Sequence, residues 1–534
     1  MARPAPHRKV SVSACRCRYT CHPLRQSFER SIVTLVDQAP PLTSAPAHRV
    51  NGWAIPAGYV WAICVALWLF VDNLMPVSTA VQIVCLAVIL AALGLIGAAA
   101  MSGDLTVSTA LARLRLGPWM AIGFALVFGL ATLMWLTDFI GYHGLVTRAS
   151  LMPAGVVSGV GFLALVVAYR STPRQIRAWG NGIDRRLRGD ATFSAGPMSV
   201  WSLWGVAFVA QAIGFARGSL GYLSDPVSAL STTSSADAIL SILTELGTLA
   251  TVVAAWRFAV TKRPAAMVLL AWVAASQLAV GLFAGGKQAA IVQLIAIVVG
   301  YSARSKIRWR LVATAGLIVL FIIGPFVTAY RTTVVTGSGR LSPAEALQSV
   351  DFYQLATVSL TGGSNGGTLV TSLDRWSRIG DLAIIVEKTP HPIGYLSPIE
   401  LLGGPFLGFI PRSIWPSKPI LDAGYQINQQ YYESPADVYS SAAATPYGDL
   451  YRHGGMGVVV IGMAALGMFV RTVDDRRGGA SNVEPRLLFL PMLLFPELVK
   501  QEVDYMGLCA SLVSIILAAA LGARMVSRRT STPS

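Results

Sequence analysis

The chain has 534 residues, of which 54% are apolar and only 13% are charged, and its mean hydropathy is +0.58. Soluble domains typically carry about 25% charged residues, so this composition excludes an ordinary soluble enzyme. The net charge of +16 raises the question of nucleic acid, but the charges lie between apolar runs, as in membrane proteins, where an ionised group within hydrocarbon costs roughly 2.5–3.5 kcal/mol. The sequence therefore predicts an all-α polytopic membrane protein that does not bind nucleic acid.

Residues 1–50 are basic and rich in proline, and they contain no apolar run of spanning or signal-peptide length. We expect them to form a disordered cytoplasmic tail. Cys15, Cys17, Cys21 and His22 could in principle bind zinc, but their spacing matches no common structural zinc pattern. We therefore expect no metal there.

A spanning helix needs about 20 mostly apolar residues, and we predict about twelve such helices. They are 53–71, 77–100, 118–137, 151–169, 199–216, 237–258, 265–284, 288–301, 311–329, 454–470, 487–499 and 507–523. The predicted organisation is the tail 1–50, nine helices in 51–329, one large loop 330–452, three helices in 453–523 and a short tail 524–534.

The distribution of positive charge predicts the orientation of these helices. With the N-terminus inside, the inner connections after the tail hold 22 Lys and Arg residues, whereas the five short outer loops hold 4. Short cytoplasmic loops retain positive charge, so both termini are predicted to be cytoplasmic. The loop 330–452 then faces outward.

The loop 330–452 is where the sequence predicts the chemistry, since loops of this length usually have structure or function of their own. A capping-box pattern at 342–345 predicts an amphipathic helix on the membrane surface. A Gly-rich joint at 361–367 separates it from a second helical stretch, 368–387. The loop contains no cysteine, which excludes a disulfide framework there.

Two ionisable residues among the helices have alternative interpretations. Gly281-x4-Gly286-Lys287 has the spacing of a phosphate-binding loop, but Gln288 follows and no strand is expected before it. Lys287 is predicted either to extend to the membrane interface or to face an anionic lipid head group. Glu245, within the sixth predicted helix, is a functional hypothesis by default. The alternatives are that it is protonated or that it pairs with Arg217 or another helix, and we favour the pairing.

The segment 403–419 holds two cations, Arg412 and Lys418, on backbone stiffened by four prolines and flanked by apolar residues and Trp415. One interpretation is a membrane-hugging loop in which Arg412 pairs with one of the loop's acids, since the loop has eight basic and ten acidic residues. The other is anion binding by Arg412, whose planar guanidinium suits phosphate oxygens.

Three segments resemble a known family. Residues 410–419 read Ile-Pro-Arg-Ser-Ile-Trp-Pro-Ser-Lys-Pro, which is similar to the "iPR-x-x-WP-x-KP" signature of the O-antigen polymerase (Wzy-like) oligosaccharide repeat-unit polymerases. Upstream, Arg-Trp-Ser at 375–377 and Ile-Ile-Val-Glu-Lys-Thr-Pro at 384–390 resemble that family's Arg-containing helix and "vi-x-x-TP" exit. Downstream, 445–457 resembles "gElY-x-nfG-x-x-G", with Asp449 in place of Glu and Arg452-His453-Gly454 in place of "nfG".

The resemblance implies a GT-C-like membrane glycosyltransferase of the bacterial inner membrane. Its reaction would transfer a polyprenyl-diphosphate-linked glycan to a sugar hydroxyl on another lipid-linked repeat unit, with a flippase and a chain-length regulator as possible partners. Fixed guanidiniums would stabilise the charge on the departing diphosphate. By this resemblance Arg412 and Arg375 are the first catalytic and diphosphate-binding candidates, followed by Lys418, Arg331 and Lys287.

The acceptor hydroxyl would need a base. His391 is the histidine within the loop, with Glu387, Glu400 and Asp449 as carboxylate alternatives. No D-x-D carboxylate cluster is visible, so we expect metal independence and no cofactor. Two rival functions stay open, a flippase for lipid-linked glycans and an O-antigen-ligase-type glycosyltransferase.

Overall fold

The computed structural model is predominantly helical, and unit Asn51–Ser534 contains every element discussed below. The structure describes residues 79–103, 105–112, 114–136, 146, 150–178, 180, 182, 192–193, 196–217, 235–303, 309–324, 326–327, 330, 335–336, 339–340, 377–401, 403, 410, 415, 423–434, 442–475 and 484–528.

Eight described segments are long and apolar enough to cross a membrane, which confirms a polytopic membrane protein. They are Thr79–Ser102 (α3), Leu116–Leu136, Leu151–Ser171 (α6), Pro197–Ala216 (α8), Ala236–Thr261, Pro264–Phe283 (α12), Gly455–Asp475 (α23) and Tyr505–Met525 (α25). Leu116–Leu136 comprises α5 (Leu116–Phe124), a π turn, η2 (Ala125–Gly129), and a 3-10 stretch, η3 (Leu130–Leu136). Ala236–Thr261 comprises α10 (Ser235–Thr244) and α11 (Leu246–Thr261), which meet at Glu245.

Three further predicted spans form shorter helices. They are α13 (Lys287–Ser302), α14 (Trp309–Ile318) with the π turn η6 (Val319–Ile323), and α24 (Arg486–Val499). At 1.5 Å per residue, the 14 residues of α24 reach about 21 Å, short of a hydrocarbon core of about 30 Å. Twelve full spans are therefore not confirmed, and the first predicted span, 53–71, lies outside the described residues.

The first group of helices packs α3, α5, η2, α6 and α23 against one another, with α6 and α23 in the most extensive contact. Small residues allow close approach: a Cβ at Gly467 of α23 would lie only 2.3 Å from the carbonyl oxygen of Leu165 in α6. Close backbone packing through small residues is a general basis of helix association in membranes, where hydrophobic transfer from water contributes nothing.

At the ends opposite the loop 330–452, a buried carboxylate holds this first group together. Asp474, near the end of α23, accepts hydrogen bonds from the backbone N–H groups of Leu116 (2.8 Å) and Gly117 (3.0 Å) at the start of α5. The Tyr169 hydroxyl of α6 donates to the same carboxylate at 2.8 Å. These contacts require α5 to run opposite to α6 and α23, as the alternating topology predicts.

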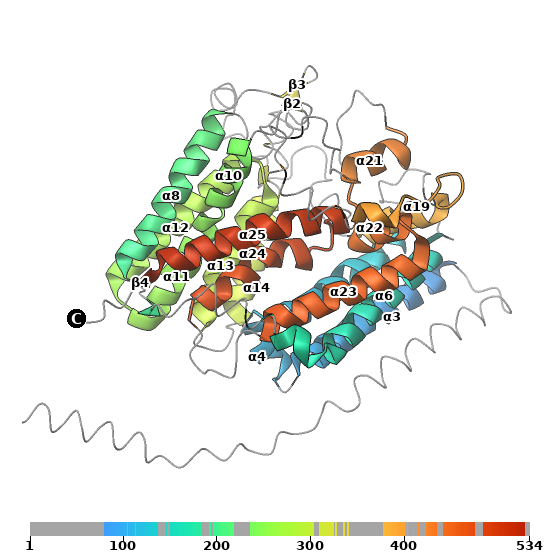
Figure 1. Ribbon diagram of the computed structural model, residues 1–534, viewed down its shortest axis with the longest axis horizontal. Helices are drawn as coiled ribbons and strands as arrows, with labels where there is room; N and C mark the ends of the chain where they lie inside the picture. Colours follow the sequence, from blue (N-terminus) through green and yellow to red (C-terminus); the bar gives the residue numbers. More distant parts are fainter. Residues whose placement is uncertain are drawn as a thin grey trace, which may run out of the picture. The chain divides into compact units, whose positions relative to one another are not determined.

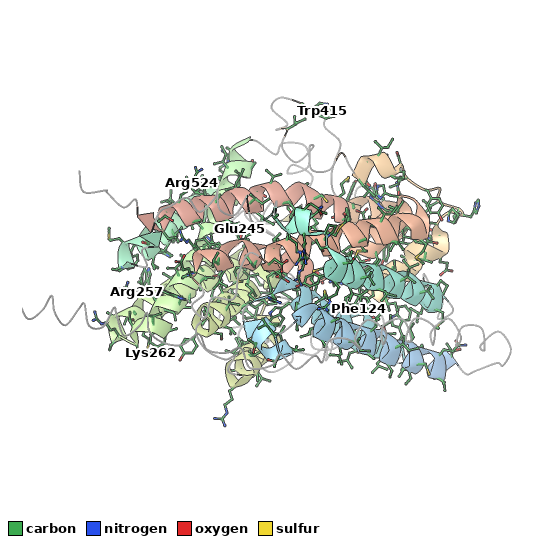
Figure 2. All side chains as sticks on the ribbon, turned by 60° about the horizontal axis from the view of Figure 1, so that its bottom comes forward. Phe124, Glu245, Arg257, Lys262, Trp415 and Arg524 are labelled. Atoms are coloured by element: carbon green, nitrogen blue, oxygen red, sulfur yellow. The ribbon has the colours of Figure 1, made fainter. Side chains whose placement is uncertain are left out.

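The second group packs α8, α10, α11, α12 and α13 together, and α14 contacts α13. Buried amides link its members: Gln211 and Gln277 exchange hydrogen bonds at 2.8 and 3.1 Å, and Gln293 bonds to Thr248 and Thr251. Figure 2 shows Arg257, Lys262 and Arg524 near one end of the helices and Glu245 in the interior.

Arg217 pairs with another acid and not with Glu245, so this branch of the expected pairing is wrong. Arg217 lies 3.4 Å from Asp237 in the first turn of α10. Glu245 lies two helical turns further along, close enough to Glu497 of α24 for the two carboxyls to interact electrostatically. The sequence could not distinguish these acids, because both follow Arg217 within one predicted helical region.

Helices α24 and α25 lie between the two groups (Figure 1). Helix α24 contacts α5 and α23 on one side and α11 and α13 on the other, while α25 runs from α22 (Pro446–Arg452) to α8, α10 and α11. The end of α25 adds a two-residue strand, β4 (Ser527–Arg528), antiparallel to β1 (Thr192–Phe193). These two helices therefore connect the halves of the bundle.

The described part of the long loop contains three short helices, α19 (Ile379–Lys388), α21 (Ala423–Gln430) and α22, and a hairpin of β2 (Val335–Thr336) with β3 (Gly339–Arg340). Helix α19 confirms the C-terminal part of the predicted helix 368–387. The amphipathic helix predicted to begin at 342–345 and the Gly-rich joint lie outside the described residues. A last short helix, α4 (Val107–Ala112), joins α3 to α5.

The contact between α6 and α23 generates a prediction. Gly467→Val would place a side chain against the Leu165 carbonyl and separate the helices, so we expect a large loss of thermal stability in detergent. Gly457→Val, in the same helix, is the matched control, because a Cβ there meets no described atom within 4 Å. Equal melting temperatures for the two variants would contradict the packing.

Candidate functional site

Charged side chains of the described residues cluster where the segment 445–453 meets the connection between α24 and α25. We call this set the junction cluster: Arg378, Asp381, Asp449, Arg452, His453, Glu502 and Asp504. Its centre is helix α22. Thr445 is the N-cap of this helix and accepts a hydrogen bond from the Gly448 N–H at 3.1 Å, and Pro446 is the first helical residue. This is a regular N-cap followed by the residue type favoured at the first helical position.

Helix α22 lies within the bundle and not above it. A Cβ at Gly161, halfway along α6, would lie 2.9 Å from the ring of Tyr447. The Tyr447 ring also contacts Phe128 of η2, with ring centroids 5.1 Å apart. The last residues of the predicted external loop thus descend to the middle of a membrane-spanning helix, which the hydropathy pattern did not predict.

Asp449 and Arg452 form a buried ion pair within α22. The Arg452 Nε donates to Asp449 Oδ1 at 2.9 Å, and the two side chains are 1% exposed or less. Arg452 Nη2 also donates to Gln426 of α21 at 3.1 Å. Asp449 Oδ2 accepts from the backbone N–H of Met506, in the first turn of α25, at 3.0 Å. One carboxylate therefore links α22 to α25, and its cation links α22 to α21.

His453 follows at the C-terminus of α22 and is also fully buried. Its Nδ1 lies 2.7 Å from the carbonyl oxygen of Asp449, and its Nε2 lies 3.9 Å from a carboxylate oxygen of Glu400. Within the described part of the chain, Nε2 and the Nη1 of Arg452 have no hydrogen-bond partner. Such buried orphan atoms are uncommon and call for an explanation.

The connection between α24 and α25 supplies the other side of the junction cluster. It reads Lys-Gln-Glu-Val-Asp at 500–504. Asp504 caps α25 by accepting from the Gly507 N–H. Burial, and secondarily the negative charge of Asp449, raises the pKa of Asp504 to about 7. Asp504 is therefore a candidate proton-binding group in the physiological range.

Arg378 joins this connection to the loop helix α19. It contacts Asp381 in the first turn of α19 at 3.2 Å and Glu502 in a short charge-assisted hydrogen bond. The hydroxyl of Tyr432 donates to Asp381 at 2.6 Å. The arginine thus holds α19 against the start of α25.

Four described cations beside the loop lie close to carboxylates. Arg378 and Arg452 are paired as above, Lys388 lies 2.8 Å from Glu433, and Lys500 lies 3.8 Å from Glu497. In the junction cluster itself, four carboxylates face two arginines. The junction cluster therefore has a surplus of carboxylates, and the described residues contain no group of three or more His, Cys, Asp or Glu arranged to hold a metal ion.

The sequence-predicted site residues divide into two sets. Arg412, Arg375, Lys418 and Arg331 lie outside the described residues. His391 is exposed in the turn that follows α19. Lys287 begins α13, after the cap residue Gly286, and the preceding element is the helix α12, so the strand of a phosphate-binding loop is indeed missing there.

Trp415, which anchors the interfacial interpretation of 403–419, is 38% exposed (Figure 2).

Sequence reasoning missed most of the junction cluster. The sequence indicated Asp449 as a departure from a family pattern and as one alternative for the base, and Arg452 and His453 as departures alone. It gave no indication of Arg378, Asp381, Glu502 or Asp504. One usable signal was present: four polar or charged residues occur among the five at 500–504, directly between two apolar helices. Ionisable groups so close to spanning helices are costly and usually functional or paired.

Comparison with known proteins gives one finding. A family model described as a domain of unknown function (DUF8712) matches residues 219–477, a little under half of the chain. That match includes all three segments that carry the resemblance described above. No curated protein and no solved structure matches the chain.

The raised pKa of Asp504 predicts a pH dependence of stability. Folded Asp504 holds its proton up to about pH 7, whereas an unfolded aspartate loses it near pH 4. The folded state therefore loses stability as the pH rises through this interval. Asp504→Asn keeps the cap but cannot ionise, so we expect its melting temperature to fall less than that of the wild type between about pH 5 and about pH 8.

Glu433→Gln is the control for this measurement, because Glu433 is exposed and Lys388 lowers its pKa. Its melting temperature should follow that of the wild type across the interval. If Asp504→Asn shows the same dependence on pH as the wild type, Asp504 does not bind the proton.

Proposed function

We propose that the chain is a polysaccharide polymerase that transfers a polyprenyl-diphosphate-linked glycan to a sugar hydroxyl on another lipid-linked repeat unit. The observation that carries the proposal is the resemblance of three separate segments, 375–390, 410–419 and 445–457, to the Wzy-like polymerases. The polytopic fold, with a long loop between membrane-spanning helices, fits such an enzyme.

Packing adds support from two of these segments. Helices α19 and α22 lie side by side: a Cβ at Gly448 would be 2.7 Å from Ile385. The backbone N–H of Leu396 donates to the carbonyl of Arg452 at 2.8 Å. Residues about 60 positions apart in the loop therefore form one unit, as expected if both motifs serve a single site. The third motif, 410–419, lies between them in the sequence.

In this proposal Arg412 and Arg375 bind the diphosphate, assisted by Lys418, Arg331 and Lys287. The diphosphate gains negative charge as the glycosidic bond breaks, so preorganised guanidiniums stabilise the transition state more than the ground state. Carboxylates already neutralise Arg378 and Arg452 of the junction cluster. The cations for the diphosphate are therefore best sought among Arg412 and its companions.

The enzyme would work at the outer face of a bacterial inner membrane, with both termini in the cytoplasm. The excess of Lys and Arg in the connections opposite the long loop supports this orientation. Three arginines at one end of the first helix group also support it. Arg115 donates to the carbonyl of Ser102, Arg170 donates to the carbonyl of Ala100, and Arg471 lies over the ring of Tyr169.

A flippase for the same lipid-linked glycans is the second candidate, and one observation favours it. The end of α24 and the start of α22 both lie at the depth of spanning helices: a Cβ at Gly123 of α5 would be 2.3 Å from the Val499 carbonyl. Discontinuous helices of this kind form substrate sites in transporters.

A ligase, which transfers finished polymer to another acceptor, shares the chemistry of the polymerase and differs only in substrate.

The proposal predicts the phenotype of a gene deletion in the native host. A polymerase deletion should leave single repeat units on the carrier lipid and no long surface glycan. Absence of outward-facing repeat units would instead indicate a flippase, and full-length polymer held on the carrier would indicate a ligase. Electrophoresis of surface glycan and mass analysis of the carrier-linked pool distinguish these outcomes.

Complementing this deletion tests the arginine. Arg412→Ala should slow chain extension about 100- to 1000-fold, the usual effect of removing one preorganised donor, at normal protein abundance. Arg412→Lys should recover little, because a point charge does not reproduce the two-pronged contact. Arg340→Ala, an arginine of the same loop outside the motifs, should support normal chain length. Normal glycan from Arg412→Ala would remove Arg412 from the mechanism.

A further inference from the structure

The ring of His453 is held in one tautomer. Nδ1 lies 2.7 Å from the carbonyl oxygen of Asp449, and a carbonyl can only accept, so Nδ1 must carry the proton. In the neutral ring Nε2 is then a hydrogen-bond acceptor with an available lone pair. Within the described structure Nε2 has no hydrogen-bond partner, although the ring is fully buried.

Two partly exposed side chains lie close to this histidine in the fold, one beside Nε2 and one beside Gly455, two positions further along the chain. Glu400, whose carboxylate lies 3.9 Å away, has a 57% exposed side chain, which is free to change rotamer. Tyr395 is 47% exposed, and its ring packs edge-on against Tyr451 with centroids 6.3 Å apart. The Tyr395 hydroxyl lies beside Gly455, two residues after His453, because a Cβ added at Gly455 would be only 3.0 Å from the hydroxyl oxygen.

The side chains of His453, Glu400 and Tyr395 suit a neutral ligand that is rich in hydroxyl groups. Carboxylate and imidazole lone pairs accept hydrogen bonds from hydroxyl groups, and an exposed tyrosine ring offers an apolar face for the C–H face of a sugar. A diphosphate would be repelled by Glu400, and the nearby guanidinium of Arg452 is already paired with Asp449. This part of the chain therefore fits the acceptor and not the lipid diphosphate.

We propose that His453 is the general base of the transfer and that Tyr395 and Glu400 line the subsite for the acceptor sugar. The inference rests on the proposed function. The acceptor O–H would give its proton to Nε2 while its oxygen bonds to the anomeric carbon of the donor. The bond between that carbon and the diphosphate breaks, and its electron pair leaves with the lipid diphosphate. The imidazolium then returns its proton to water.

This assignment replaces His391 as the base. His391 is exposed in the turn after α19, whereas His453 lies in the unit formed by two of the three motif segments. Asp449 holds the imidazole through its backbone carbonyl, and its own carboxylate is engaged by Arg452 and Met506. Asp449 is therefore a positioning residue, and a carboxylate with both oxygens occupied is poorly available as the base.

The test uses membranes isolated from the deletion strain carrying each full-length variant, with the host's own lipid-linked repeat units as substrate. His453→Asn keeps a short donor for the Asp449 carbonyl but removes the basic nitrogen. We expect normal abundance and melting temperature, and a rate of chain extension lower by about 100- to 10,000-fold. A purely structural role would leave this variant active.

The acceptor subsite has its own matched pairs. Tyr395→Ala should slow extension roughly 3- to 10-fold, since one ring contact is lost, and Tyr395→Phe, which restores the ring without its hydroxyl, should recover most of that loss. Glu400→Gln should slow extension, whereas Glu433→Gln, an exposed carboxylate paired with Lys388, should not. Equal rates within both pairs would overturn the subsite.

The outcomes separate the two proposals. Wild-type membranes that extend no chains would overturn the proposed function. Wild-type extension together with near-normal extension by His453→Asn would overturn the inference alone. Loss of extension in His391→Asn, with activity retained in His453→Asn, would assign the base to His391 instead.

Discussion

The buried pair of Asp449 and Arg452 is the interaction on which the described site depends. Both groups are removed from water, which costs several kcal/mol per ion unless every polar atom finds a partner. Asp449 uses both oxygens, one for Arg452 and one for the first turn of α25. Losing either charge would leave the other buried and unpaired, a loss of about 3–5 kcal/mol. The pair therefore fixes how α22 meets the helix that joins the two groups.

A second buried carboxylate also accepts hydrogen bonds from a helix N-terminus, at the opposite ends of the helices. Asp474 accepts from the first N–H groups of α5, as Asp449 accepts from the first turn of α25. Helix N-termini carry unsatisfied donors and partial positive charge. Away from water these donors must be satisfied by protein groups. Two buried acids thus hold the starts of the two helices that flank α24.

The sequence predicted the coarse fold because hydropathy records what a spanning helix needs. Eight of the twelve predicted spans form helices of adequate length, and α6 and α23 begin and end within a few residues of the predicted positions.

The candidate site was harder to predict from the sequence than the fold. Asp449, Arg378 and Glu502 acquire their roles through contacts between segments far apart in the chain, and hydropathy carries no information about such pairing. The depth of α22 was missed for the same reason: 445–453 reads as a loop until Tyr447 is seen against the middle of α6.

The short helix α24 explains why the polar residues 500–504 sit where they do. Gly123, which touches its last carbonyl, is the eighth residue of the span Leu116–Leu136, about 10 Å from one end of that span and about 20 Å from the other. The chain therefore leaves its helix before reaching the loop side. Non-helical backbone at this depth is tolerated only when protein or enclosed water satisfies it. The charged side chains of this segment also have partners. Lys500 contacts Glu497 and Gln288, and Glu502 contacts Arg378. Asp504 accepts a hydrogen bond from the first turn of α25. The polar break thus brings ionisable groups to the depth of the spanning helices, beside the segment 445–453.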